Sequence, residues 1–150
     1  MIIKNNNLNQ THVYLGIDFG IKKIGFAIGQ LITKQASPLS IIINKNNKID
    51  WKEIDKIIKT WDIRVIILGY PYSNKINKLN KNLEIFYSQL KVKYASKIKI
   101  IKFSEILSTE SSKETYKELR KDKIRKKKAK LDDISASIIL QSWFNENMIN

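Results

Sequence analysis

Cysteine is absent from the 150 residues, and histidine occurs once, as His12. The lack of cysteine excludes disulfides and thiolate metal sites. The single histidine argues against a histidine-rich metal site and against a Ser-His-Asp triad. No apolar run approaches the roughly 20 residues that a membrane span requires, and the first residues lack the apolar segment and cleavage site of a signal peptide. We therefore expect a cytoplasmic protein that does not contact membranes.

Acidic residues are also scarce, because 14 of them stand against 28 lysines and arginines and leave a formal net charge of +14. Such a balance favours a nucleic-acid partner. However, 25 of the 28 basic residues are lysine, and isoleucine, lysine and asparagine together fill 67 of the 150 positions. That bias is typical of drift in an AT-rich genome. The places where charge clusters therefore carry more information than its total.

Hydrophobic patterns predict a single α/β domain over residues 1–150, with residues 1–12 as a flexible N-terminal extension. Apolar runs predict strands at residues 13–18, 24–30, 38–44, 64–69 and 97–103. Helical spacing predicts helices at residues 51–61, 77–94, 108–121 and 131–147. Three successive strands, followed by strands separated by helices, imply a mixed five-stranded sheet with helices on both faces.

Two acids follow predicted strands. Asp18 ends the first strand in the stretch "YLGIDFGIKKIGFAIG", and Glu105 lies two residues beyond Phe103, just past the last strand. If these strands run parallel, both acids emerge at the same carboxyl edge of the sheet, where α/β proteins usually build their sites.

A third acid comes from the start of the last predicted helix. Helical periodicity places Asp132 on the apolar face with Ala136, and Asp133 on the polar face with Ser137 and Gln141. We therefore expect Asp132 to point inward and Asp133 outward.

Three converging carboxylates repel one another unless a cation or a proton joins them. Oxygen ligands of this kind suit Mg²⁺ or Mn²⁺. Two such ions can activate a water and stabilise the leaving oxygen of a phosphodiester. The sequence thus predicts a metal site made by Asp18, Glu105 and Asp132.

Four ordered stretches carry a family resemblance: "GIDFGIKKIGFAIG", "VIILGYPYS", "FSEILSTESS" and "KLDDISASIILQSWF". Together they resemble the motifs of the YqgF/RuvX family, a branch of the ribonuclease H-like nucleases, from about Val13 to Phe144. The resemblance implies a ribonuclease H-like fold, and it places the family's metal-binding acids on Asp18, Glu105 and Asp132.

The family is regarded as nucleases that process the 5′ end of pre-16S ribosomal RNA, and its members were earlier regarded as Holliday junction resolvases. Three positions depart from its pattern, because Ser104 replaces an acid, Ile106 replaces an arginine and Tyr70 replaces a leucine. Without that arginine, the expectation of a substrate contact beside Glu105 is weaker.

Basic and hydroxyl side chains near the acids are candidate substrate contacts. They are Lys22, Lys23, Ser108, Thr109, Arg125, Lys126, Lys127 and Lys128. Each has a structural alternative, namely a solvated hairpin tip for the first two, helix caps for the next two and a solvated loop for the last four. Asp18 could equally bond turn amides, and Asp132 could favour the helix dipole. Tyr70 is expected to pack rather than stack on a base, and Trp51, Trp61 and Trp143 are expected in the core.

The predicted function is a Mg²⁺- or Mn²⁺-dependent, two-metal-ion nuclease acting on pre-16S ribosomal RNA within the pre-ribosome, as a monomer or weak dimer. One alternative is a resolvase of branched DNA, which would favour a symmetric dimer. A second is a catalytically weakened RNA-binding protein. A third, an ATP-binding module of the actin and sugar-kinase type, requires two such domains and a second Asp-x-Gly segment, which this chain lacks.

Overall fold

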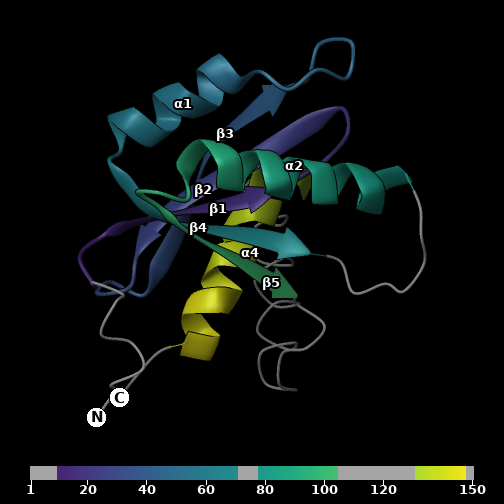
Figure 1. The fold of residues 1–150 in the computed structure, drawn as a ribbon. Helices are drawn as coiled ribbons and strands as arrows, with labels where there is room; N and C mark the ends of the chain where they lie inside the picture. The colour runs from purple at the N-terminus through teal and green to yellow at the C-terminus, as the bar shows by residue number, and fades with distance from the viewer. Residues whose placement is uncertain (1–9, 71–77, 105–130, 148–150) are drawn as a thin grey trace.

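The computed structural model describes residues 10–70, 78–104 and 131–147, with the backbone alone for residues 131–133. These ranges contain one five-stranded sheet in the spatial order β3-β2-β1-β4-β5 (Figure 1). The strands are β1 (Val13–Asp18), β2 (Lys23–Gln30), β3 (Gln35–Ile43), β4 (Ile63–Tyr70) and β5 (Lys99–Ser104). β2 runs antiparallel to β1 and β3, whereas β4 runs parallel to β1 and β5. The predicted mixed sheet is confirmed.

Helices cover both faces of this sheet. Helices α1 (Trp51–Thr60) and α2 (Lys78–Tyr94) lie on one face, and α4 (Leu131–Asn147) lies on the other (Figure 1). The side chain of Asp50 caps α1 by accepting a hydrogen bond from the Glu53 amide at 3.2 Å. The helix predicted at residues 108–121 lies outside the described residues. Within the described ranges, no helix has the length and apolar character needed to cross a membrane.

Side chains of β1 alternate between two core layers. Leu15 and Ile17 pack with Phe86 in the layer under α1 and α2. Tyr14 points the other way, and its ring centroid lies 5.3 Å from that of Trp143 on α4. Burial on both faces explains why this strand reads as a nearly continuous apolar run.

β3 forms one edge of the sheet, but it begins at Gln35 rather than at Pro38 as the sequence predicted. The register between β2 and β3 shifts between Phe26 and Ala27, and Pro38 stands opposite Ala27. Proline is tolerated at such a place because an edge strand has one unpaired side and a bulge interrupts the ladder.

Two helix side chains differ from their predicted environments. Trp61 is 41% exposed rather than buried, because α1 ends at Thr60 and Trp61 is its C-cap residue. Ser137 is fully buried rather than on a polar face, and its hydroxyl donates to the carbonyl of Ile134 at 2.7 Å. Helical periodicity fails at Ser137 because α4 is buried around most of its circumference. Trp143 is buried as predicted.

The start of the described chain is tied to the turn between β2 and β3. The carbonyl of Gln10 accepts a hydrogen bond from the Ile32 amide at 3.0 Å, and that of Thr11 accepts one from the Gln30 side chain. Residues 1–9 of the predicted flexible extension lie outside the described residues.

Candidate active site at the carboxyl edge of the sheet

Asp18 is the last residue of the central strand. It pairs with Gly25 of β2, and on its other side β1 lies beside β4. Because strand side chains alternate, Asp18 belongs to the same face as Tyr14 and Gly16, which is the face covered by α4. Asp18 also lines a pocket of about 290 Å³ together with Lys22 and Lys23. The structure therefore confirms that Asp18 lies at the carboxyl end of a strand, as predicted.

The other parallel strands end at the same edge. β4 pairs with β5 in parallel register, so that Tyr70 stands beside Ser104 at the ends of the two strands. The next residue after Ser104 is Glu105, which lies outside the described residues. The expectation that the strands before Asp18 and Glu105 run parallel is thus confirmed, while the position of the Glu105 carboxylate remains a prediction.

Helix α4 approaches β1 closely at a glycine. A Cβ atom on Gly16 would lie 2.8 Å from the Cβ of Leu140 and 2.9 Å from the carbonyl oxygen of Ala136. Such distances are shorter than packed atoms tolerate, so only glycine fits between this strand and this helix. The small residues Gly16 on β1 and Ala136 on α4 allow the two backbones to approach closely.

Helix α4 crosses the sheet with its later residues toward the start of β1 (Figure 1). Its later residues, Trp143 and Phe144, contact Tyr14, whereas Ala136 lies against Gly16. One turn of helix advances about 5.4 Å and two residues of strand about 6.6 Å. The backbone of Asp132, one turn before Ala136, therefore lies at the same end of the sheet as Asp18.

Asn44 supports the turn beside the candidate site, and the sequence did not predict this role. It follows β3, is 5% exposed, and its side-chain amide donates to the carbonyls of Gly20 at 3.2 Å and Ile21 at 3.0 Å. Its backbone amide donates to the carbonyl of Lys22 at 2.8 Å. One residue thus holds three consecutive carbonyls of the turn between β1 and β2. With asparagine so frequent in this chain, the sequence carried no signal for it.

An aromatic stack anchors the other end of the same turn. The ring of Phe19, directly after Asp18, stacks on Phe86 of α2 with 4.7 Å between centroids, and Phe86 stacks in turn on Trp51 at 5.5 Å. Stacked aromatic rings of this kind add to the stability gained by burial alone. The chain on both sides of the Asp18 turn is therefore fixed to the body of the domain.

Tyr70 packs against its neighbours, as expected. Its ring lies edge-on to Tyr87 at 6.2 Å, and the ammonium of Lys102 sits 4.7 Å and 4.4 Å from the two ring centroids. Burial raises the pKa of the Tyr70 hydroxyl, and the nearby Glu84 carboxylate raises it further. The Ser104 hydroxyl, at the adjacent strand end, is buried without a hydrogen-bond partner.

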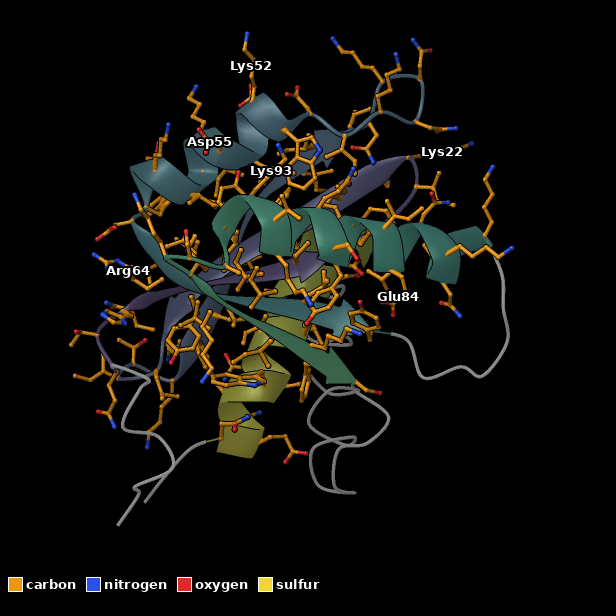
Figure 2. The ribbon with its side chains drawn as sticks, viewed as in Figure 1. Lys22, Lys52, Asp55, Arg64, Glu84 and Lys93 are labelled. Atoms are coloured by element: carbon orange, nitrogen blue, oxygen red, sulfur yellow. The ribbon has the colours of Figure 1, made fainter. Side chains whose placement is uncertain are left out.

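The structure places only some of the predicted site residues. Lys22 is exposed at the tip of the turn (Figure 2). Lys23 is half-buried at the start of β2. The side chain of Asp132 is not described. Ser108, Thr109, Arg125, Lys126, Lys127 and Lys128 lie outside the described residues. Among the residues that are described, no three acids, histidines or cysteines form a group that could hold a metal ion.

A larger pocket, of about 630 Å³, lies at the opposite edge of the sheet, between the ends of α1 and α2. Its two acids are paired locally, with Lys59 and Asp55 2.9 Å apart and Arg64 and Asp62 3.3 Å apart. Tyr94 donates to Asp55 at 3.4 Å. Size alone would favour this pocket, whereas the carboxyl ends of the parallel strands, where α/β proteins usually bind ligands, lie at the Asp18 edge.

The fold is similar to that of two proteins of known structure. RuvC from T. thermophilus in complex with a Holliday junction substrate superposes with a TM-score of 0.61 at 10% sequence identity, over 91% of this chain and 97% of that one. The Fowlpox virus Holliday junction resolvase gives a TM-score of 0.53 at 19% identity, over 91% and 99%. Together with the sheet order, these matches define the chain as an α/β domain of the ribonuclease H-like class.

Sequence comparison narrows the class to a family. Residues 12–146 match the family model described as RuvX: Holliday junction resolvase. A protein of Francisella tularensis subsp. tularensis (strain WY96-3418), named "Putative pre-16S rRNA nuclease", is 33% identical over 135 residues, which are 89% of this chain and 96% of that relative. The chain belongs to the RuvX family.

Proposed function

We propose that this chain is a divalent-metal-dependent nuclease that trims the 5′ end of pre-16S ribosomal RNA in the cytoplasm, within the pre-ribosome. The observation that carries the proposal is Asp18, at the carboxyl end of the central strand, with the backbone of α4 brought close at Gly16. The name of the Francisella relative supports ribosomal RNA as the substrate.

The donor set fits Mg²⁺ or Mn²⁺. Asp18 presents carboxylate oxygens at the edge of a pocket, and the chain offers no cysteine and only one histidine to compete for a softer metal. Asp18, Glu105 and Asp132 would hold the ions. When bound, such ions supply an activated water and stabilisation of the leaving oxygen.

The protein's own contribution is to hold these acids and the RNA backbone. Asp18 is fixed by its strand pairing and by the stacked Phe19 that follows it. Lys22 and Lys23 line the same pocket, so that their positive charge attracts the phosphates flanking the cut. Further contacts are proposed from the amides at Ser108 and Thr109 and from the basic run of Arg125, Lys126, Lys127 and Lys128.

The proposal is tested by cleavage of two substrates side by side. A 5′-extended 16S precursor RNA and a synthetic four-way DNA junction are incubated with the protein, with Mg²⁺ or with EDTA. We expect metal-dependent cutting of the RNA alone. Cutting of the junction alone would instead support a resolvase, and a stable dimer in solution would agree with that outcome. Tight, salt-sensitive binding without cutting would support an RNA-binding protein.

A further inference from the structure

Asn44 bonds to a turn that lies more than twenty residues before it in the chain. Its two side-chain N–H groups donate to Gly20 and Ile21, and its backbone N–H donates to Lys22. The residues on both sides of this turn are candidate functional groups, Asp18 before it and Lys22 and Lys23 within and after it. Asn44 itself does not line the pocket that they share.

Burying the polar side chain of Asn44 costs folding free energy, which an apolar residue at the same place would not. Its side chain is 5% exposed, and its Oδ1 atom is buried without a hydrogen-bond partner. A buried acceptor without a partner destabilises the folded state, whereas an apolar side chain of similar size would avoid that cost. What asparagine provides and an apolar residue cannot is the pair of donors that holds the carbonyls of Gly20 and Ile21.

Those bonds also set the orientation of the turn. The C=O and N–H groups of one planar peptide point in opposite directions, so carbonyls directed at Asn44 turn the amide N–H groups of Ile21 and Lys22 away from β3. The Lys22 side chain, at the same peptide, is exposed and projects from the end of the hairpin (Figure 2). Phe19 fixes the start of the turn by stacking on Phe86, which leaves its middle to Asn44.

We propose that Asn44 is a positioning residue that holds the β1–β2 turn in the conformation in which Lys22 meets the RNA backbone. The inference rests on the proposed function, because it assigns Asn44 to the substrate side of that same site. Asn44 acts through the turn and does not itself touch RNA. Asp18, held by its own pairing with Gly25, keeps its place without Asn44.

The main test separates substrate binding from the chemical step. Asn44→Ala should raise KM for a 5′-extended 16S precursor RNA about three- to tenfold, the loss of roughly one charged contact. The value of kcat should stay within about twofold. Asn44→Asp keeps the shape but cannot donate to the two carbonyls, so it should raise KM at least as much. An unchanged KM in either variant would overturn the proposal.

Coupling to Lys22 distinguishes positioning from loss of fold. If Asn44 acts through Lys22, then Asn44→Ala should have little further effect on KM in a Lys22→Ala background. Full additivity of the two substitutions would contradict the proposal. Ile98→Ala is the matched control, because Ile98 is also 5% exposed but lies at the opposite edge of the sheet. It should lower the melting temperature while leaving KM unchanged.

A binding measurement keeps the inference separate from the proposed function. In the Asp18→Asn background, which should not cut, Asn44→Ala should raise the Kd for the same RNA about three- to tenfold. Absence of metal-dependent cleavage by the unmodified chain would overturn the proposed function. An unchanged Kd in the double variant would overturn the role of Asn44 alone.

Discussion

The two edges of the sheet differ in how their polar groups are matched. The amino edge is the end of the sheet at which the parallel strands begin. There, the acids of the larger pocket are paired with neighbours in sequence, Asp55 with Lys59 and Asp62 with Arg64. At the carboxyl edge, the Asn44 and Ser104 side chains each keep a buried polar atom without a partner, as do the buried Tyr14 on β1 and Ser142 on α4. Figure 2 shows the contrast in position, with Asp55 at one end of the molecule and Lys22 at the other.

The volume of a pocket is therefore a poor guide to the functional site in this fold. Exposed ion pairs between residues close in sequence contribute little free energy, and the two charges already satisfy each other. Buried polar atoms without partners are rare in folded proteins, so those of Asn44 and Ser104 need an explanation. A site that binds and cuts a polyanion supplies one, because its groups are arranged for a substrate rather than for one another.

Removing one acid from each edge should give the largest difference between the two edges. Asp18→Asn should lower RNA cleavage by about a thousandfold or more, since metal ligation is worth several kcal/mol in the transition state. RNA binding should change by less than about threefold. Asp55→Asn, at the other edge, should cleave at the unmodified rate. Initial rates under Mg²⁺ measure both, and full activity in Asp18→Asn would exclude this acid from the metal site.

A second test alters the contact between α4 and β1. Gly16→Ala should destabilise the fold by about 1–3 kcal/mol, because the new methyl group would press on the carbonyl of Ala136. Cleavage should fall as well, since displacement of α4 moves the backbone of Asp132 away from Asp18. Gly69→Ala is the matched control, because its methyl group meets the end of the flexible Ile139 side chain. Urea unfolding should show a smaller loss there, and equal losses would contradict the argument.

The order of strands and helices could be predicted from sequence because this sheet is buried on both faces. Continuous apolar runs such as "VYLGID" and "RVIILG" leave no other place for a strand than the centre of a covered sheet. Periodicity was less informative where it assumed a single covered face. Ser137 is buried because α4 is enclosed, and Trp61 is exposed because the helix ends one residue earlier.

The candidate site could be predicted only in part. The position of Asp18 follows from a local rule, since an acid at the end of a buried strand emerges at the carboxyl edge. Asn44 could not be found in this way, because its role depends on the approach of β3 to a turn distant in sequence. Glu105, and the side chain of Asp132, remain predictions that mutagenesis can test.

A third test compares lysines at the two edges. Lys22→Ala should weaken RNA binding about three- to tenfold and lower the salt dependence of the binding constant by about one unit of slope, as expected for one phosphate contact. Lys59→Ala should change neither, because Lys59 is engaged with Asp55 at the far edge. Titrations of RNA at several salt concentrations provide the measurement. Equal slopes for Lys22→Ala and the unmodified chain would remove this lysine from the RNA interface.

The smallest expected effect is on the pH dependence of stability, and it arises from Tyr94 at the amino edge. Burial, with the Asp55 carboxylate adding to it, raises the pKa of Tyr94 to about 12 from an ordinary value of 10.0. A group whose pKa is raised on folding contributes stability that is complete below the unfolded pKa and lost as pH rises through the folded one. The free energy of unfolding should therefore decline between pH 10 and about 12, and Tyr94→Phe should reduce that decline.

The size of the Tyr94 effect should be below about 1 kcal/mol, because the side chain is only partly buried and solvent screens its partner. Urea unfolding on either side of pH 10 compares the variant with the unmodified chain. RNA cleavage near neutral pH should not change, since Tyr94 lies at the edge away from Asp18. A loss of cleavage in Tyr94→Phe at unchanged stability would show that the two edges are coupled, which their separate charge pairing argues against.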